Sequence, residues 1–277
     1  MFQVTEQPHD LSRVQFVAAD MDNTLLDENG ELPEEIFGRV EALSELGVTF
    51  AIASGRPLVT LQALFPELRH KIMLIGDNGG VISNKGTIVY QADLPASGYK
   101  PMIELAHSRG DSCMLCATET VYFDEGDRAN DEVYATFYYE RTYVPNLEDV
   151  SPQADKFTIY LPEGDSVEKV REVYGPAFGD AYTVASSGPV WIDITPKGMD
   201  KGAAMRHVSE LLAIPLANMM AFGDTFNDAE MLKAVGFGYM MANATPGMER
   251  YADYVAPSNV EHGVIQVIDQ LIAARRV

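Results

Sequence analysis

Two carboxylates one residue apart, Asp20 and Asp22, follow a short apolar run that covers Val14 to Ala19 apart from Gln15. Such runs, bounded by turn residues, are typical of buried strands in parallel sheets. Ligands of open α/β sheets bind beyond the carboxyl ends of the strands. Neighbouring carboxylates repel each other unless a positive group lies between them, and Mg²⁺, which prefers oxygen ligands, fits that position. A plain turn held by local hydrogen bonds is the alternative for this stretch alone.

A second acidic group follows another predicted strand, residues 219–222. The next six residues read Gly-Asp-Thr-Phe-Asn-Asp and bring Asp224, Asn227 and Asp228 to the end of that strand. The arrangement repeats the one at Asp20, with carboxylates placed just past a buried strand.

A possible phosphate-binding turn, Ser54-Gly55-Arg56, follows the predicted strand at 48–53 and precedes a helix. A hydroxyl group and exposed backbone N–H groups at a helix start can hold a phosphate oxygen. The alternative is an ordinary serine N-cap. Because this strand belongs to the same predicted sheet, we expect the turn to lie beside Asp20.

Lys201 stands at the start of a predicted helix with an apolar face. A positive charge there is unfavourable for the helix dipole, which suggests an anion nearby. The alternative is a solvated surface lysine, as most lysines are.

Strands and helices alternate from residue 14 to about residue 89 and again after about residue 189. This alternation predicts an α/β fold with a Rossmann-like parallel sheet and right-handed crossovers. Between residues 90 and 188 the pattern changes to α+β, which predicts an inserted domain. We therefore expect one domain formed by 1–89 and 189–277, and a second formed by 90–188.

The composition narrows the class of partner. The chain has 277 residues, 47% of them hydrophobic, a net charge of −21 and a sequence pI of about 4.5. This charge argues against nucleic-acid binding and against docking on anionic membranes. No apolar stretch approaches the roughly 20 residues that cross a bilayer, and residues 1–13 lack an apolar signal core. We expect a cytoplasmic protein, a monomer or a small homo-oligomer.

The two cysteines, Cys113 and Cys116, form a C-x-x-C pair. A redox role needs a helix start, and this segment looks like a strand. A zinc site would need a second Cys or His pair nearby in the sequence. We expect two reduced structural thiols.

The four motifs are weak one by one but strong together and in this order: Asp-x-Asp-x-Thr, Ser-Gly-Arg, Lys-Gly and Gly-Asp-x-x-Asn-Asp. Asn78 follows another predicted strand end, where it either faces the site or forms a turn. With the Asn78-Gly79-Gly80 turn and the position of the inserted domain, the chain resembles the haloacid dehalogenase-like phosphatases of the Cof type. The resemblance covers nearly the whole chain. It implies a Rossmann-like core with an inserted α+β cap, Mg²⁺ as cofactor and a small phosphorylated metabolite as substrate.

The resemblance also implies catalytic roles. Asp20 would be the nucleophile that forms an aspartyl-phosphate, and Asp22 the general acid and base. Lys201 would neutralise developing charge and steady Asp20. Asp20, Asp22, Asp224 and Asp228 would form the Mg²⁺ site, with Asp22 reaching the metal through its backbone carbonyl and Asp228 supporting it directly or through water.

The remaining implied roles concern the phosphate. Ser54 and Gly55 would bind the phosphoryl oxygens, Asn227 would bind the phosphate or order the site, and Arg56 would contact the substrate or brace its loop. The chain departs from the common family pattern at Asn23, where glycine is usual. Because asparagine tolerates left-handed backbone geometry, we expect the turn to survive.

The resulting hypothesis is a Mg²⁺-dependent phosphatase of small phosphorylated metabolites such as sugar phosphates or phosphorylated cofactors. Two alternatives stay open. A phosphomutase or phosphotransferase would pass the phosphoryl group to a second hydroxyl, and a non-catalytic protein would bind a phosphorylated ligand without turning it over.

Overall fold

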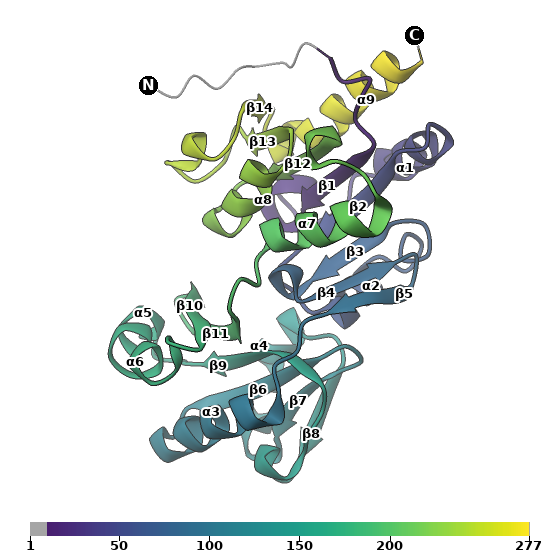
Figure 1. The fold of residues 1–277 in the computed structure, drawn as a ribbon. Helices are drawn as coiled ribbons and strands as arrows, with labels where there is room; N and C mark the ends of the chain where they lie inside the picture. The colour runs from purple at the N-terminus through teal and green to yellow at the C-terminus, as the bar shows by residue number, and fades with distance from the viewer. Residues whose placement is uncertain (1–9, 277) are drawn as a thin grey trace. The chain divides into compact units, whose positions relative to one another are not determined.

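The computed structural model describes residues 10–276, which fold into two compact units (Figure 1). The first unit contains residues 10–55, 65–89 and 200–276. The second unit contains Arg56–Leu64 and Tyr90–Met199. Part of the expectation about the N-terminus, residues 1–9, lies outside the described residues.

The first unit is built on an eight-stranded sheet with the order β14-β13-β12-β1-β2-β3-β4-β5. The strands from β14 to β3 run parallel, and β4 runs antiparallel to β3. This is the expected mostly parallel core. The strands are β1 (Phe16–Asp20), β2 (Thr49–Ala53), β3 (Met73–Gly76), β4 (Val81–Asn84), β5 (Thr87–Gln91), β12 (Met219–Gly223), β13 (Phe237–Met241) and β14 (Tyr254–Ala256).

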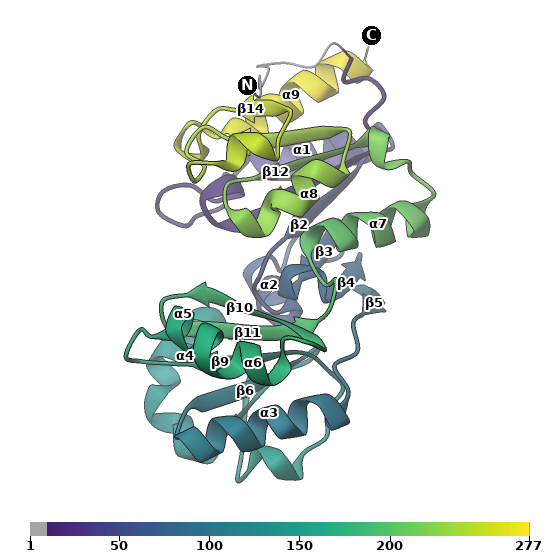
Figure 2. The ribbon, with the colours of Figure 1, turned by 60° about the vertical axis from the view of Figure 1, so that its left-hand side comes forward.

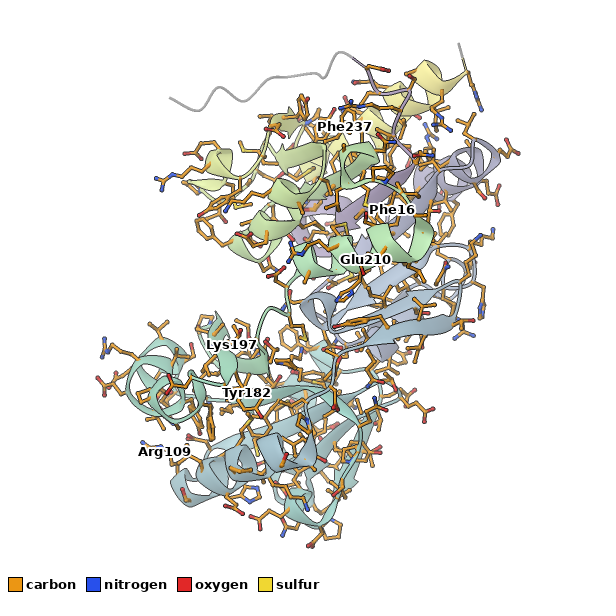
Figure 3. The ribbon with its side chains drawn as sticks, in the orientation of Figure 1. Phe16, Arg109, Tyr182, Lys197, Glu210 and Phe237 are labelled. Atoms are coloured by element: carbon orange, nitrogen blue, oxygen red, sulfur yellow. The ribbon has the colours of Figure 1, made fainter. Side chains whose placement is uncertain are left out.

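Helices cover both faces of this sheet (Figure 2). Helix α1 (Glu35–Glu45) packs against α9 (Gly263–Arg275) on one face, and α7 (Lys201–Leu212) packs against α8 (Ala229–Ala234) on the other. Phe16 on β1 and Phe237 on β13 are buried in the first unit, where Figure 3 labels them. The helices thus bury the apolar strands on both sides, as crossover connections in parallel sheets do.

The strand register brings the candidate site residues to one edge of the sheet. Strand β1 lies between β12 and β2, with Ala19 opposite Phe222 on one side and Asp20 opposite Ala53 on the other. The loops that leave these three strands therefore start at the same level. The local sequence predicts the strands, and their order in the sheet collects the polar turns.

The second unit contains a six-stranded mixed sheet with the order β10-β11-β9-β6-β7-β8. All neighbours are antiparallel except β7 and β8, which are parallel. The sequence did not predict β8. The strands are β6 (Ser112–Ala117), β7 (Val121–Asp124), β8 (Arg141–Val144), β9 (Ala154–Tyr160), β10 (Tyr182–Gly188) and β11 (Trp191–Pro196). The hairpin β10–β11 spans residue 188, where the sequence pattern places a domain boundary.

The second unit also contains α-helices. They are α2 (Leu58–Leu64), α3 (Ala96–Arg109), α4 (Asp131–Phe137), α5 (Ser166–Lys169) and α6 (Gly175–Phe178). No helix among residues 10–276 is both long and apolar enough to cross a membrane.

The two faces of the second sheet carry separate cores. Cys113 and Leu115 of β6 pack with Tyr99 of α3 on one face. Cys116 packs with Tyr134 of α4 on the other face, among stacked aromatic rings. Both cysteines are buried, as expected for structural thiols on a strand.

Candidate active site

A buried lysine joins two carboxylates at the centre of the candidate site. The Nζ atom of Lys201 lies 2.5 Å from Oδ1 of Asp20 and 2.6 Å from Oδ1 of Asp228. The side chains of Lys201 and Asp228 have no exposed surface, and that of Asp20 is 9% exposed. A lysine this deeply buried needs such partners, because an unpaired buried charge is costly. The solvated-lysine alternative is therefore wrong.

Asp228 is fixed from its other side by the loop after β12. Its Oδ2 atom accepts hydrogen bonds from the backbone N–H groups of Asp224 (3.0 Å) and Thr225 (3.2 Å). A Cβ atom on Gly223 would lie 2.4 Å from Cβ of Asp228, so the position next to Asp228 requires glycine. Asp228 thus positions both Lys201 and the backbone at Asp224.

Three carboxylates gather here: one oxygen each of Asp20, Asp224 and Asp228 lie within 4.8 Å of one another. Thr24 donates a hydrogen bond of 3.2 Å to Oδ1 of Asp224. Three ionised carboxylates and one ammonium sum to −2, which a divalent cation would neutralise. An all-oxygen donor set of this charge fits Mg²⁺.

The pKa shifts express the same excess of negative charge. Burial, with the nearby charge of Asp228, raises the pKa of Asp224 to about 6. Burial and then Asp228 also raise the pKa of Asp20, against the opposing effect of Lys201. Burial lowers the pKa of Lys201, but the charges of Asp20 and Asp228 outweigh it and the net shift is upward. Lys201 therefore stays protonated, and a bound dication would favour the ionised carboxylates.

The loop after β1 turns sharply at Asn23, which has φ 58° and ψ 8°. The expected left-handed geometry at this position is confirmed. The backbone carbonyl of Asn23 accepts a 2.8 Å hydrogen bond from Nδ2 of Asn243. Asn259 donates its backbone N–H to Oδ1 of Asn243 and its side-chain Nδ2 to the carbonyl of Leu26. Two asparagines from distant segments thus hold the loop that carries Asp22.

A second bridge joins the loops after β3 and β12. Nδ2 of Asn227 lies 3.2 Å from Oδ1 of Asn78, and the backbone N–H of Asn78 bonds to the carbonyl of Ser54 (3.0 Å). A Cβ atom on Gly55 would lie 3.2 Å from the side-chain amide of Asn78. Ser54, Gly55 and Asn227 are therefore brought together through Asn78.

Two further predicted site residues, Asp22 and Arg56, are not members of the three-carboxylate group. Asp22 is half-buried in the loop Met21–Leu25, and its carboxylate is outside the three-carboxylate group found among residues 10–276. Arg56 is the first residue of the segment Arg56–Leu64, which belongs to the second unit.

Helix α7 is anchored at the end that carries Lys201. Asp200 caps the helix by accepting the N–H of Ala203 at 2.6 Å, which offsets the unfavourable charge at this end. Gly79 has φ 101°, and a Cβ atom there would lie 2.6 Å from the carbonyl oxygen of Asp200. This close approach fixes the helix start against the loop after β3.

Sequence reasoning assigned no role to Thr24 or Asn259 and left Asn78 undecided between a turn former and a site residue. The available signals were weak: Thr24 belongs to the first motif, and Asn78 follows a strand end. Asn259 gave no local signal, because its contacts come from a segment more than 230 residues away.

Comparison with known proteins places the chain among relatives of similar length. The sequence profile of the haloacid dehalogenase-like hydrolases matches residues 17–268. The 5-amino-6-(5-phospho-D-ribitylamino)uracil phosphatase YbjI of Escherichia coli (strain K12) is 28% identical over 262 residues, which cover 94% of this chain and 96% of YbjI. The HMP-PP phosphatase of Citrobacter koseri is 29% identical over 239 residues, 83% of this chain and 84% of that protein.

Solved structures show the same fold. SMU.1108c from Streptococcus mutans UA159 has a TM-score of 0.83 and 27% identity, and the match covers 94% of this chain and 99% of that one. The subclass IIB sugar phosphatase BT4131 has a TM-score of 0.76 and 22% identity, over 93% and 98% of the two chains. The match to a subclass IIB structure agrees with a parallel core and an inserted cap.

Proposed function

The chain belongs to the haloacid dehalogenase-like hydrolase family, and from that premise we propose that it is a Mg²⁺-dependent phosphatase that works through an aspartyl-phosphate on Asp20. The observation that carries the proposal is the buried hydrogen-bonded chain Asp20–Lys201–Asp228, with Asp224 beside it, at the end of β1. This arrangement holds a carboxylate next to a permanent positive charge, as attack on a phosphate requires.

The proposed reaction has two steps. A carboxylate oxygen of Asp20 attacks phosphorus, the bond to the substrate oxygen breaks, and Asp22 gives the leaving alcohol its proton. A water molecule then attacks the aspartyl-phosphate, Asp22 takes its proton, and Asp20 and inorganic phosphate are released. Bound Mg²⁺ would supply neutralisation of the phosphoryl charge.

The chain's own residues hold the reacting groups. Lys201 fixes the rotation of the Asp20 carboxylate and offers positive charge near the phosphoryl oxygens. Ser54, Gly55 and Asn227 are the proposed phosphoryl contacts, with Asn78 keeping their loops together. Arg56 retains its sequence-based role as a proposal, a substrate contact or a brace for its loop.

The substrate class follows from the relatives. YbjI and the HMP-PP phosphatase are named for small phosphorylated compounds, and we propose a small phosphorylated metabolite here as well. We propose further that residues 90–188 act as the cap that selects the substrate and excludes water. The first candidate substrates to assay are the compounds for which these two relatives are named, together with a set of sugar phosphates; we call this set the substrate panel.

The test is hydrolysis of an aryl phosphate, with Mg²⁺ and with chelator, by wild type and Asp20→Asn. We expect Mg²⁺-dependent release of phosphate by wild type and none by the variant. Mass spectrometry should find a phosphoryl adduct on the peptide containing Asp20 after rapid acid quenching. Asp269→Asn, which alters a surface ion pair with Arg39, is the matched control and should keep wild-type activity.

The two alternative functions give different outcomes in this experiment. Transfer of the phosphoryl group to an added alcohol in place of water would identify a phosphotransferase. Phosphate binding without turnover of any compound in the panel would identify a non-catalytic protein. Equal hydrolysis by Asp20→Asn and wild type would refute the nucleophile assignment.

A further inference from the structure

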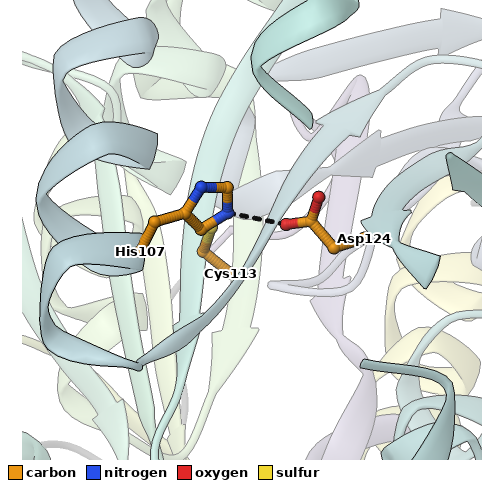
Figure 4. A group of neighbouring side chains, drawn as sticks. All are labelled: His107, Cys113 and Asp124. Carbon is orange, nitrogen blue, oxygen red and sulfur yellow. Dashed lines mark hydrogen bonds and ion pairs between the residues drawn. The ribbon is translucent and has the colours of Figure 1, made fainter. Parts of the chain in front are cut away.

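A second group of metal-ligand side chains lies in the second unit, separate from the carboxylates described above. One donor atom each of His107, Cys113 and Asp124 lie within 4.8 Å of one another. They come from α3, β6 and β7, and Figure 4 shows the imidazole of His107 bonded to Asp124 with Cys113 beside the ring. We call these three residues the histidine–cysteine cluster.

The ring of His107 is held at both nitrogens. Its Nε2 atom lies 2.7 Å from Oδ2 of Asp124, and its Nδ1 atom lies 3.1 Å from Oε1 of Glu148. Histidines that bind metals commonly bond their second nitrogen to a carboxylate, which fixes the ring. Glu148 already occupies that position at Nδ1, and Nε2 faces Asp124.

Asp124 is fixed in a similar way. Its Oδ1 atom accepts a 2.8 Å hydrogen bond from the backbone N–H of Leu147. The other oxygen, Oδ2, is the one that meets His107. One oxygen is thus anchored to the backbone and the second is directed into the cluster.

The charge around the cluster favours a cation. The charges of Asp124, Asp127 and Glu148 all act on Cys113, and His107 bonds to two of these carboxylates. Asp111 also acts on Cys113, and its own charge is paired with Lys169 at 2.5 Å. A dication bound between Asp124 and Cys113 would reduce this negative excess.

A catalytic thiol is the other use of such a trio, and the environment of Cys113 opposes it. The residue is fully buried. Burial, and then the charges of Asp124 and Asp127, raise the pKa of its thiol. Nucleophilic cysteines need a lowered pKa and partial exposure, whereas a metal can replace the thiol proton outright.

We infer that His107, Cys113 and Asp124 form a binding site for a divalent transition metal of the Zn²⁺ type, with Glu148 orienting the histidine. Sulfur, nitrogen and oxygen donors together suit Zn²⁺ or Co²⁺, whereas Mg²⁺ prefers oxygen alone. Binding would release two protons to solvent, one from Sγ of Cys113 and one from Nε2 of His107. The metal would tie α3 to β6 and β7.

The dimensions allow this site after small side-chain movements. Donor atoms around a tetrahedral Zn²⁺ lie roughly 3.3–3.8 Å apart, given metal–ligand distances of about 2.0–2.3 Å. Donor pairs that lie as far apart as 4.8 Å would contract by up to about 1.5 Å. Nε2 of His107 and Oδ2 of Asp124, which are 2.7 Å apart, would instead separate by about 0.6 Å to admit the ion. The side chains of His107 and Glu148 are 31% and 42% exposed, which gives the ion a path from solvent.

The test is titration of the full-length protein with Co²⁺ in excess Mg²⁺, followed by absorption spectroscopy. A thiolate bound to Co²⁺ gives a charge-transfer band in the near ultraviolet, and the carboxylate site contains no sulfur donor. We expect the band in wild type and its loss in Cys113→Ser, which should also bind one Co²⁺ fewer per chain in equilibrium dialysis. Cys116→Ser is the matched control, since Cys116 lies on the same strand and on the opposite face; it should keep the band.

Asp124→Asn provides a test that leaves both cysteines in place. Asparagine can still accept the Leu147 N–H through its oxygen but loses the charge that faces His107, so the Co²⁺ affinity should fall at least about tenfold. Circular dichroism verifies that each variant is folded. The inference is refuted if wild type shows no band at a tenfold excess of Co²⁺, or if the band survives in folded Cys113→Ser. Neither result depends on phosphatase activity.

Discussion

Nζ of Lys201 and Oδ1 of Asp228 lie 2.6 Å apart, and neither side chain has any exposed surface. The pair is part of a larger assembly, since the other oxygen of Asp228 holds two backbone N–H groups. We therefore expect Asp228 to matter for stability as well as for activity.

Asp228→Asn should lower the free energy of unfolding by about 2–4 kcal/mol. An amide has one acceptor oxygen, so it must turn its NH₂ group toward either the Lys201 ammonium or the two backbone N–H groups. Urea unfolding followed by circular dichroism measures the change. Asp269→Asn, at an exposed ion pair, should cost less than about 1 kcal/mol; equal costs for the two variants would contradict the buried network.

Asp224→Asn should show a stability effect that depends on pH and on Mg²⁺. The pKa of Asp224 is raised to about 6, above its value in the unfolded chain. Its stabilising contribution is therefore complete below about pH 4 and is lost as the pH rises through 6. Asparagine stays neutral at every pH. Without metal, the free energy of unfolding of the variant should therefore rise relative to that of wild type by up to about 3 kcal/mol between pH 4 and 7.

With Mg²⁺ at pH 7, wild type should be more stable than Asp224→Asn. The dication stabilises the ionised carboxylate of wild type, and the variant has one charged ligand fewer. Thermal unfolding at pH 4, 5.5 and 7, with Mg²⁺ and with chelator, gives the comparison. A difference between the two proteins that stays constant with pH would show that Asp224 has an ordinary pKa.

Asn23→Gly should leave kcat within about twofold of wild type, because glycine adopts a φ of 58° at no steric cost. Asn23→Val should lower stability by about 1–2 kcal/mol and kcat by about tenfold or more, since a shift of the turn misplaces Asp22. Steady-state kinetics and urea unfolding of both variants supply the measurement. A fully active valine variant would show that the turn geometry does not position the acid.

Gly55→Ala should raise KM for an aryl phosphate by about tenfold while changing kcat less. The new methyl group would lie 3.2 Å from the Asn78 amide and would press on its bond to Asn227. Gly38→Ala is the control, because a Cβ atom there meets nothing within 4 Å on an exposed turn of α1. That variant should keep wild-type kinetics and gain about 0.5–1 kcal/mol of stability. An unchanged KM in Gly55→Ala would remove Gly55 from the phosphate site.

Local patterns predicted the elements that position the site. Apolar runs that end in polar turns gave β1, β2 and β12, and the change of pattern near residue 90 gave the inserted α+β segment. The left-handed turn at Asn23 also followed from the residue type. These features depend on a few adjacent residues, so a single sequence carries them.

The contacts between distant segments were not predictable in this way. The Asn227–Asn78 bond joins residues 149 positions apart, and Asn259 reaches back to Leu26. Strand β8 was missed because Arg141–Val144 is short and lacks alternation of apolar and polar residues. The histidine–cysteine cluster was not predicted for the same reason as the contacts of the asparagines. Its three residues come from three different elements, so no local pattern reveals it.

The placement of the two cysteines on opposite faces of β6 has a consequence for oxidation chemistry. Cys113 and Cys116 belong to different cores, so a disulfide between them would require the sheet to come apart. An alkylating reagent can reach each thiol only when the core on its own face opens. The rate of alkylation of Cys113 in the native protein would therefore report the opening of one face of the sheet. The rate for Cys116, three residues later, would report the opening of the other face.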